Sequence, residues 1–325
     1  MDAVVIVLDV LITISLLASL LYLIKELLYH KEETRAEMKV GGWVKTIKII
    51  VIANILLFLD MFGIGSYGPH MVCWKILKVS RDEWLPGSLN VSMLVATLVE
   101  TLYLVNTIDV EMMTLIPCII ASTIGSFFGA GVVAKLNVDK IRLAIGISLI
   151  VVGIVLILGL TGALDFEGGD AHGLSGWKLI VIVAISLLFG ALMTIGIGIY
   201  APLLACATLL GMDPTYALPI MLGTCAFLIP VAAIRFTKES MVADRPRYDR
   251  KIAVIENATG WIGPVIAANV ILSLPISAMK WIVVVVLFIV AAMMLYQWHN
   301  KSVDKLAEAE DAELARIKGQ APPSE

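Results

Sequence analysis

Charged residues are scarce in this chain of 325 residues. Asp, Glu, Lys and Arg make up 16% of it, whereas soluble domains contain roughly a quarter. Hydrophobic residues account for 59% and the mean hydropathy is +0.94. Several apolar runs reach the ~20 residues that a helix needs to cross ~30 Å of hydrocarbon. The composition therefore excludes an ordinary soluble domain, gives no basis for nucleic-acid binding, and predicts a polytopic helical membrane protein.

Motifs for metal-dependent and ATP-driven chemistry are missing as well. Neither an H-E-x-x-H motif nor the Walker-A sequence G-x-x-x-x-G-K-[ST], which cradles nucleotide phosphates, occurs in the chain. The four cysteines (Cys73, Cys118, Cys206 and Cys225) lie in apolar segments without C-x-x-C or Cys/His spacing. Such cysteines are typical of helix packing rather than of a metal site. We therefore expect no enzyme activity, no cofactor and no metal.

The apolar runs divide the chain into candidate membrane spans. The first residues lack a basic leader and a small-residue cleavage site, so we expect a retained helix there rather than a signal peptide. The candidate spans are residues 3–24, 86–106, 111–134, 141–163, 217–236, 252–272 and 279–298.

Two further apolar stretches, 47–79 and 178–211, are interrupted by the same glycine pattern. The first contains GIGSYGPH at 63–70 and the second contains GIGIYAP at 196–202. The matching residues are separated by a constant offset of 133 (196 minus 63): Gly63, Gly65, Tyr67 and Pro69 in the first, and Gly196, Gly198, Tyr200 and Pro202 in the second. The arms after the breaks, 67–78 and 200–211, are too short to cross a bilayer alone. We therefore predict two re-entrant hairpins.

The distribution of basic residues supports this prediction. If each broken stretch returns to its own side, all 24 Lys and Arg residues except Lys178 and Lys280 fall on one face. By the positive-inside rule that face is cytoplasmic. We therefore expect a multi-pass protein of the cell membrane with an external N-terminus and a cytoplasmic C-terminus. The first hairpin enters from the cytoplasm and the second from outside.

These observations predict an all-α polytopic membrane protein made of two inverted repeats. Each repeat is a re-entrant broken-helix hairpin plus three transmembrane helices, and one extra N-terminal helix precedes them. The expected divisions are 1–42 for the extra helix and a cytoplasmic loop, 43–163 for repeat 1, 164–176 for an external linker, 177–298 for repeat 2 and 299–325 for a charged cytoplasmic tail. We expect the extra helix and the tail to be peripheral.

Helices broken near the midplane of inverted repeats are typical of secondary transporters. Each break leaves backbone N–H groups that need a partner in hydrocarbon, and a half-helix N-terminus favours an anion. We therefore place a small-anion site between the two breaks. Its predicted residues are Gly63, Gly65, Ser66, Tyr67, His70, Gly196, Gly198, Ile199 and Tyr200. For a single Gly-x-Gly the alternative is close helix packing.

Ionisable residues within the spans are candidates for proton coupling, because their burial is costly. Asp60, three residues before Gly63, and Glu100 in the span 86–106 are the two that we select. For Asp60 the alternative is a structural pair with His70, which could itself be a core residue. For Glu256 we expect an ion pair with Arg250 or Lys251.

The two motifs resemble the sulfite exporter TauE/SafE family, also called the 4-toluene sulfonate uptake permease family. Its members have two related halves, each opening with a glycine-rich stretch followed by a proline. FGIGSYGPHMVCWKIL and TIGIGIYAPLLACATLLGMD fill those positions here, and the resemblance covers about 43–298. The family usually has G-x-G-G-G, whereas this chain has Ser66-Tyr67 and Ile199-Tyr200 after the second glycine. The resemblance implies transport of sulfite, thiosulfate or organosulfonates such as sulfoacetate.

Together, these features favour a secondary transporter of small anions that works by alternating access. Its expected partners are the anion and the lipid bilayer, with protons as a candidate coupling ion. The alternatives are an anion channel and a non-transporting receptor or assembly subunit. The direction of transport, the preferred anion, the coupling ion and the oligomeric state stay open at this point.

Overall fold

The computed structural model describes residues 3–133, 138–161, 171–193, 197–242, 246–271 and 276–299. These residues form the helices α1 to α14 and one short 3-10 turn, with no β-strand among them. Four of the described helices are long and apolar enough to cross a membrane: α1 (Ala3–Tyr29), α3 (Gly42–Asp60), α9 (Gly176–Met193) and α11 (Pro214–Val242). The structure is thus compatible with the predicted α-helical membrane protein.

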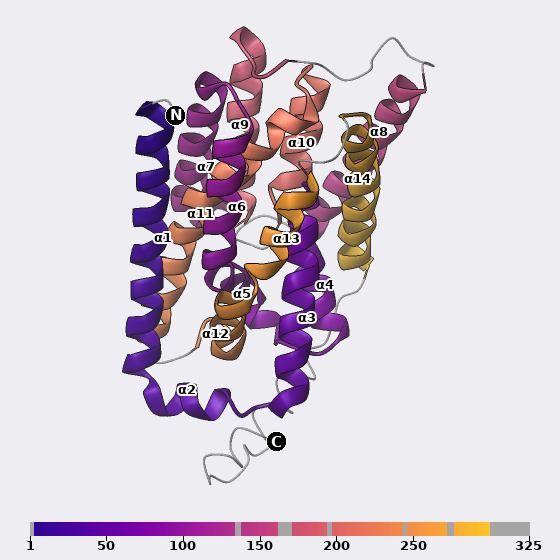
Figure 1. Ribbon diagram of the computed structural model, residues 1–325. Helices are drawn as coiled ribbons and strands as arrows, with labels where there is room; N and C mark the ends of the chain where they lie inside the picture. The colour runs from indigo at the N-terminus through magenta and orange to yellow at the C-terminus, as the bar shows by residue number, and fades with distance from the viewer. Residues whose placement is uncertain are drawn as a thin grey trace.

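The first broken stretch folds back toward the end of the molecule from which it starts. α1 runs from the end marked N to the opposite end, where α2 (Lys31–Glu37) lies across the base (Figure 1). α3 then rises to the middle of the molecule, the chain turns over residues 61–66, and α4 (Tyr67–Ile76) descends toward the α2 end. α5 (Leu85–Ser92), α6 (Leu94–Thr107), α7 (Met112–Val133) and α8 (Val138–Leu160) follow.

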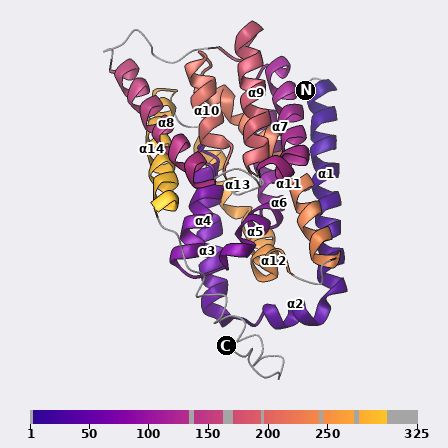
Figure 2. The same cartoon turned by 180° about the vertical axis from the view of Figure 1, so that it is seen from behind.

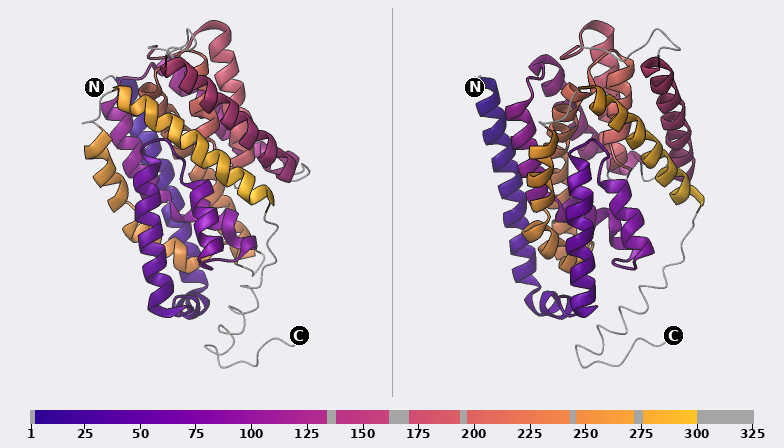
Figure 3. Two further views of the ribbon diagram at one scale, coloured as in Figure 1. Left: turned by 90° about the vertical axis from the view of Figure 1, so that its right-hand side faces the viewer. Right: turned by 45° about the vertical axis from the view of Figure 1, so that its right-hand side comes forward.

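The second broken stretch does the same from the other end. α9 enters at the end opposite to α2, and α10 (Tyr200–Leu209) returns toward it (Figures 1 and 2). α11 then runs down the molecule, and the chain continues through α12 (Arg250–Thr259), α13 (Ile262–Ile271) and α14 (Ile276–His299). α8 and α14 pack together at a marked tilt to α3 (Figure 3). The two hairpins thus enter from opposite ends.

α4 and α10 end in the same way, at the offset of 133. Val79 N–H bonds to Trp74 C=O at 2.8 Å, and Met212 N–H bonds to Ala207 C=O at 3.0 Å. Between them, Lys78 and Gly211 both have a positive φ, of 52° and 94°. This six-to-one bond across a left-handed residue is the Schellman ending of a helix. The two helix endings therefore share one backbone geometry.

In each half, the first helix of the hairpin packs against a helix of the other half. α7 lies along α9, and α12 and α13 lie along α3. Both contacts depend on glycine: a Cβ on Gly125 would be 2.0 Å from the Leu187 carbonyl oxygen, and one on Gly263 would be 2.2 Å from that of Asn54. Leu187 and Asn54 are themselves 133 residues apart (187 minus 54). Small residues at such crossings let helix backbones approach closely.

The first helix lies at one edge of the molecule (Figure 1), and one of its faces packs against the neighbouring helices. α1 packs against α11 and α6, and its buried face includes Ile12 and Leu16. The Ser19 hydroxyl donates to the Pro230 carbonyl oxygen at 3.1 Å, and the Ser15 hydroxyl donates to that of Ala226 at 3.4 Å. Pro230 lies inside α11 and has no backbone N–H. Ser15 and Ser19 therefore donate to α11 carbonyl groups close to the point where the helix lacks this donor. The tail 300–325 lies outside the described residues.

Two predicted spans, 86–106 and 252–272, are each divided into two helices at points that the sequence did not indicate. The span 86–106 bends by 50° between α5 and α6. Asn257 stabilises this bend, because its amide donates to Val91 C=O at 2.8 Å and its oxygen accepts from Val95 N–H at 3.1 Å. In the other half, Asn54 accepts from Gly263 N–H at 3.0 Å near the start of α13. Each half thus lends an asparagine to the broken span of the other.

The helix after the second break begins earlier than we predicted. α11 starts at Pro214 instead of 217, because the Asp213 carboxylate accepts from the Thr215 N–H at 2.7 Å and caps it. Pro219 therefore lies inside α11.

Candidate functional site

The two breaks meet in the centre of the molecule. Gly65 has a φ of +74°, and a Cβ built on it would lie 3.0 Å from the Tyr200 Cβ. Conversely, a Cβ on Gly198 would lie 3.5 Å from the Tyr67 Cβ. Each break glycine therefore faces the tyrosine of the opposite break. The sequence placed these residues together, and in the structure they are in contact.

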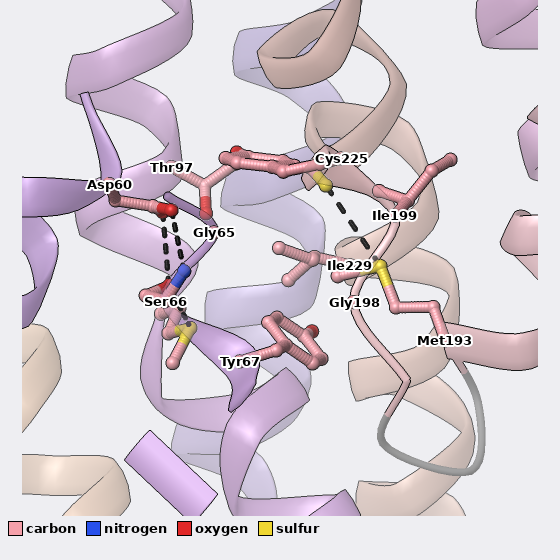
Figure 4. Close-up of a pocket in the computed structure, with 12 residues that line it drawn as sticks. Asp60, Gly65, Ser66, Tyr67, Thr97, Met193, Gly198, Ile199, Cys225 and Ile229 are labelled. Atoms are coloured by element: carbon pink, nitrogen blue, oxygen red, sulfur yellow. Dashed lines mark hydrogen bonds between the residues drawn. The ribbon is translucent and has the colours of Figure 1, made fainter. Parts of the chain in front are cut away.

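A small cavity lies between the breaks (Figure 4). Its volume is about 10 Å³, roughly enough for one water molecule. The lining includes seven of the residues that we selected from the sequence: Asp60, Gly65, Ser66, Tyr67, Gly198, Ile199 and Tyr200. The other lining residues are Met93, Thr97, Met193, Cys225 and Ile229. No lysine or arginine is among these lining residues.

Asp60 occupies the N-terminus of α4. Its carboxylate accepts from the Ser66 N–H at 2.6 Å and from the Ser66 hydroxyl at 3.0 Å, as the dashed lines of Figure 4 show. Ser66 is the residue directly before α4, where backbone N–H groups lack helical acceptors. A carboxylate at this place satisfies such a donor and interacts favourably with the helix dipole. The first half-helix therefore already has an anionic partner from its own chain.

Among the described residues, which omit 194–196, the second half-helix has no such partner. Met193 stands at the position that matches Asp60 (193 minus 60 is 133), and Ile199 matches Ser66. The side chain of Ile199 cannot accept a hydrogen bond, and no side-chain cap is found at the start of α10. The first residues of α10 therefore line the cavity with no neutralising carboxylate from the described part of the second break. The two breaks share a backbone plan but differ in charge.

The tyrosine hydroxyls have partners within the protein. The Tyr67 hydroxyl donates to the Asn90 side-chain oxygen at 2.9 Å, and the Asn90 amide donates to Pro86 C=O at 2.7 Å. The Tyr200 hydroxyl interacts with the Cys225 thiol. Our sequence prediction did not include Cys225, which lies on α11 far from either motif. In the sequence Cys225 lies in an apolar segment, and no motif there indicates a role at the site.

His70 lies behind the cavity and is fully buried. Its Nδ1 is 2.9 Å from the Ser66 carbonyl oxygen, and its Nε2 is 3.3 Å from Glu256 Oε1. The predicted pairing of Asp60 with His70 is therefore not what the structure shows, because Asp60 bonds to Ser66. The predicted pairing of Glu256 with Arg250 or Lys251 is wrong: Arg250 binds Glu26 and Glu37, and Lys251 donates to Val40 C=O.

The remaining predicted residues lie away from the cavity lining. A Cβ on Gly63 would meet Leu204 and Met221 at 3.2 Å, so this glycine packs against α10 and α11. Glu100 is buried on α6 one turn beyond Thr97, and its Oε1 has no hydrogen-bond partner among the described residues. Gly196 lies outside the described residues.

In chemical terms, the cavity combines a half-helix N-terminus, the hydroxyls of Ser66 and Thr97, and the Asp60 carboxylate. Such a set can hold one small polar or ionic group between the two hairpins. No family model, curated protein or solved structure matches this chain. The resemblance to the sulfite exporter family therefore stays a prediction from the motifs.

Proposed function

We propose that this protein is a secondary transporter of small anions that works by alternating access. The observation that carries the proposal is the meeting of two half-helices at one buried cavity, after they enter from opposite ends of the molecule. Secondary transporters repeatedly build their substrate sites from discontinuous helices at the interface of inverted repeats. Irregular backbone at membrane depth is tolerated where it lines such a cavity.

The inverted-repeat interpretation is supported by three matches at the same offset. These are the endings of α4 and α10, the facing of Gly65 with Tyr200 and of Gly198 with Tyr67, and the pair of carbonyl groups, Asn54 and Leu187, that each lie against a glycine of the other half. A two-fold relation of this kind allows one half to rock against the other around a fixed site.

The α10 end of the cavity is the part best suited to an anion. Its N–H groups offer partial positive charge, whereas the corresponding groups of α4 already interact with Asp60. We therefore place the anion against Gly198, Ile199 and Tyr200, with the Ser66 hydroxyl as a donor from the other side. A cavity for one water is smaller than sulfite, so binding requires the hairpins to separate. Alternating access provides that movement.

We assign the α2 end to the cytoplasm of a cell-membrane protein. The segments 30–41, 77–84 and 246–249 gather at this end (Figure 1), and they contain or adjoin most of the described basic residues. Positive charge is concentrated in cytoplasmic loops. On this assignment the first described residues lie outside, and the α3–α4 hairpin enters from the cytoplasm.

Sulfite, thiosulfate and organosulfonates such as sulfoacetate are the substrates that we propose, on the strength of the motif resemblance. A thermal-shift panel on the purified protein tests this choice, with sulfate, taurine and acetate as comparisons. A ligand that binds only the folded state raises the apparent stability with RT ln(1 + [L]/Kd). We expect one or more of the proposed anions to raise Tm in a saturable way. Equal, unsaturated shifts with every salt would contradict a specific anion site.

A channel or a non-transporting receptor is the competing function. A channel gives currents that far exceed transporter turnover and do not saturate with the anion, so recordings from liposomes separate the two. A receptor binds the anion in the thermal-shift panel but does not move it across the liposome membrane.

A further inference from the structure

We infer that His70 and Glu256 form a proton-binding site that couples proton movement to the anion. The inference rests on the proposed transport function, which supplies the anion. It differs from the sequence-based choice of Asp60 and Glu100 as the coupling residues. It arises from two side chains that α4 and α12 bring together deep in the protein.

The pair is isolated from water. Both side chains have a relative exposure of 0%, and Nε2 of His70 lies 3.3 Å from Oε1 of Glu256. Among the described residues, neither Glu256 oxygen has a hydrogen-bond partner, and neither does Nε2 of His70. The edge of Trp74 covers the imidazole, with ring centroids 5.1 Å apart. A buried carboxylate with no donor besides one imidazole is costly unless a proton is shared between the two groups.

The contacts of the imidazole define where the protons are. The Ser66 carbonyl oxygen, 2.9 Å from Nδ1, can only accept a hydrogen bond, so Nδ1 carries a proton. Nε2 therefore faces Glu256 either with a proton of its own or as an acceptor of the carboxyl proton. In both cases the pair holds one proton besides the one on Nδ1, so it has no net charge. A second proton gives an imidazolium beside a neutral carboxyl group, with a net charge of +1.

This second proton is the charge that an anion in the cavity needs. Among the lining residues, no lysine or arginine balances a bound anion, and Asp60 adds negative charge beside it. Uncompensated charge is expensive at membrane depth. The Ser66 backbone links the two places, because Ser66 lines the cavity while its carbonyl oxygen accepts from His70. The proton enters from the water on the side to which the cavity opens and leaves, with the anion, on the other.

The titratable side chains on the helices around the His70–Glu256 pair are few. α3 contributes the Asp60 carboxylate, which accepts from the same Ser66 whose carbonyl oxygen contacts His70. α6 contributes Glu100, which is buried. α5 contains no titratable residue, and α14 presents Met294 next to Gly68 of α4. On α4 itself, Tyr67 donates to Asn90, while Cys73 and Lys75 lie farther along the helix.

The first experiment uses proteoliposomes loaded with buffer and labelled thiosulfate as the probe. His70→Gln and Glu256→Gln are compared with the wild type and with the exposed control variants His172→Gln and Glu83→Gln. We expect a proton gradient to drive thiosulfate accumulation by the wild type and by both controls. Each buried variant should lose gradient-driven accumulation but retain thiosulfate exchange at equal pH, because exchange requires no net proton movement. Gradient-driven accumulation by either buried variant would overturn the proton site while leaving anion transport in place.

A second experiment does not depend on transport. Nitrogen NMR of isotope-labelled histidine, with His70 assigned from the His70→Gln spectrum, reports the protons on both ring nitrogens. We expect Nδ1 to be protonated and Nε2 to share a proton in the wild type, and the Nε2 signal to change in Glu256→Gln. A neutral His70 with an unbonded Nε2, or a spectrum unaffected by Glu256→Gln, would overturn the inference. If thiosulfate does not move at all, the proposed function fails for that anion and this spectrum alone decides the proton site.

Discussion

Gly65 and Gly198 occupy matching positions in the two breaks but differ in backbone conformation. Gly65 has a φ of +74° and would place a Cβ 3.0 Å from Tyr200, whereas Gly198 has no such φ and its Cβ would have an ordinary contact at 3.5 Å. A left-handed conformation costs a residue with a Cβ about 1–2 kcal/mol. Gly65→Ala should therefore lower Tm in detergent clearly, and Gly198→Ala only slightly. Equal losses would show that the two glycines have the same role.

A second prediction concerns Asp60, which accepts a hydrogen bond from the buried Ser66 N–H. Asp60→Ala leaves the Ser66 N–H without its acceptor, which should cost about 1–3 kcal/mol of stability. Asp60→Asn keeps an oxygen at that place and should stay much closer to the wild-type Tm. If both variants unfold at the same temperature, the carboxylate does not act as the cap of α4. The pH dependence of transport, measured in Asp60→Asn and in the His70 and Glu256 variants, then shows which of these groups controls it.

At the scale of elements, α1 and α2 are tied to α12 by buried charge. The Arg250 guanidinium donates to Glu26 at 2.7 Å and to Glu37 at 2.6 Å. The Tyr248 hydroxyl also donates to Glu26, at 2.5 Å, and Lys45 pairs with Asp249 at 2.7 Å. One guanidinium thus serves two carboxylates. Because such a network is costly to break by removing one partner, we interpret it as the anchor of the extra helix at the α2 end.

Glu37 gives this network a pH dependence. Burial raises its pKa from the ordinary 4.5 to about 7, against the opposing effect of Arg250. Between these two pH values the folded state binds more protons than the unfolded state, so the free energy of unfolding falls as the pH rises through this window. Glu37→Gln cannot ionise and should lose this decline. The Tm of the variant relative to the wild type should increase from pH 4.5 to 7. A difference that stays constant with pH would contradict the raised pKa.

The two hairpins could be predicted from the sequence, whereas the contacts between distant helices could not. The hairpins follow from local signals, because glycine, tyrosine and proline recur at a fixed offset and short arms cannot span a bilayer. The bend between α5 and α6 depends on Asn257, which comes from a helix 162 residues farther along the chain. The partner of Glu256 was misjudged because its sequence neighbours are basic. In the fold Arg250 pairs with Glu26 of α1 and Glu37 of α2, and His70 lies beside Glu256 instead. Contacts between distant segments were thus the part that local patterns could not give.

At the scale of the whole molecule, the arrangement predicts which residues face each side of the membrane. Trp177 lies at the start of α9, opposite to the end that holds Arg247, and both side chains are exposed. Single cysteines at these two positions, in a background without the four native cysteines, should react with an impermeant reagent from opposite sides. Arg247→Cys should react from the cytoplasm and Trp177→Cys from outside. Labelling of both from one side would contradict hairpins that enter from opposite faces.

The whole molecule is a transporter only if an anion passes between the two breaks. The most direct measurement is the initial rate of labelled thiosulfate uptake into proteoliposomes, as a function of concentration, by the wild type and by Gly198→Val. Valine adds an isopropyl group beside Tyr67 in a cavity of about 10 Å³, and we expect it to cover the N–H groups at the start of α10. The account predicts saturable uptake by the wild type and its loss in a Gly198→Val protein that remains folded by thermal unfolding. Wild-type uptake by the folded variant would contradict a site between the breaks, and uptake that never saturates would indicate a channel.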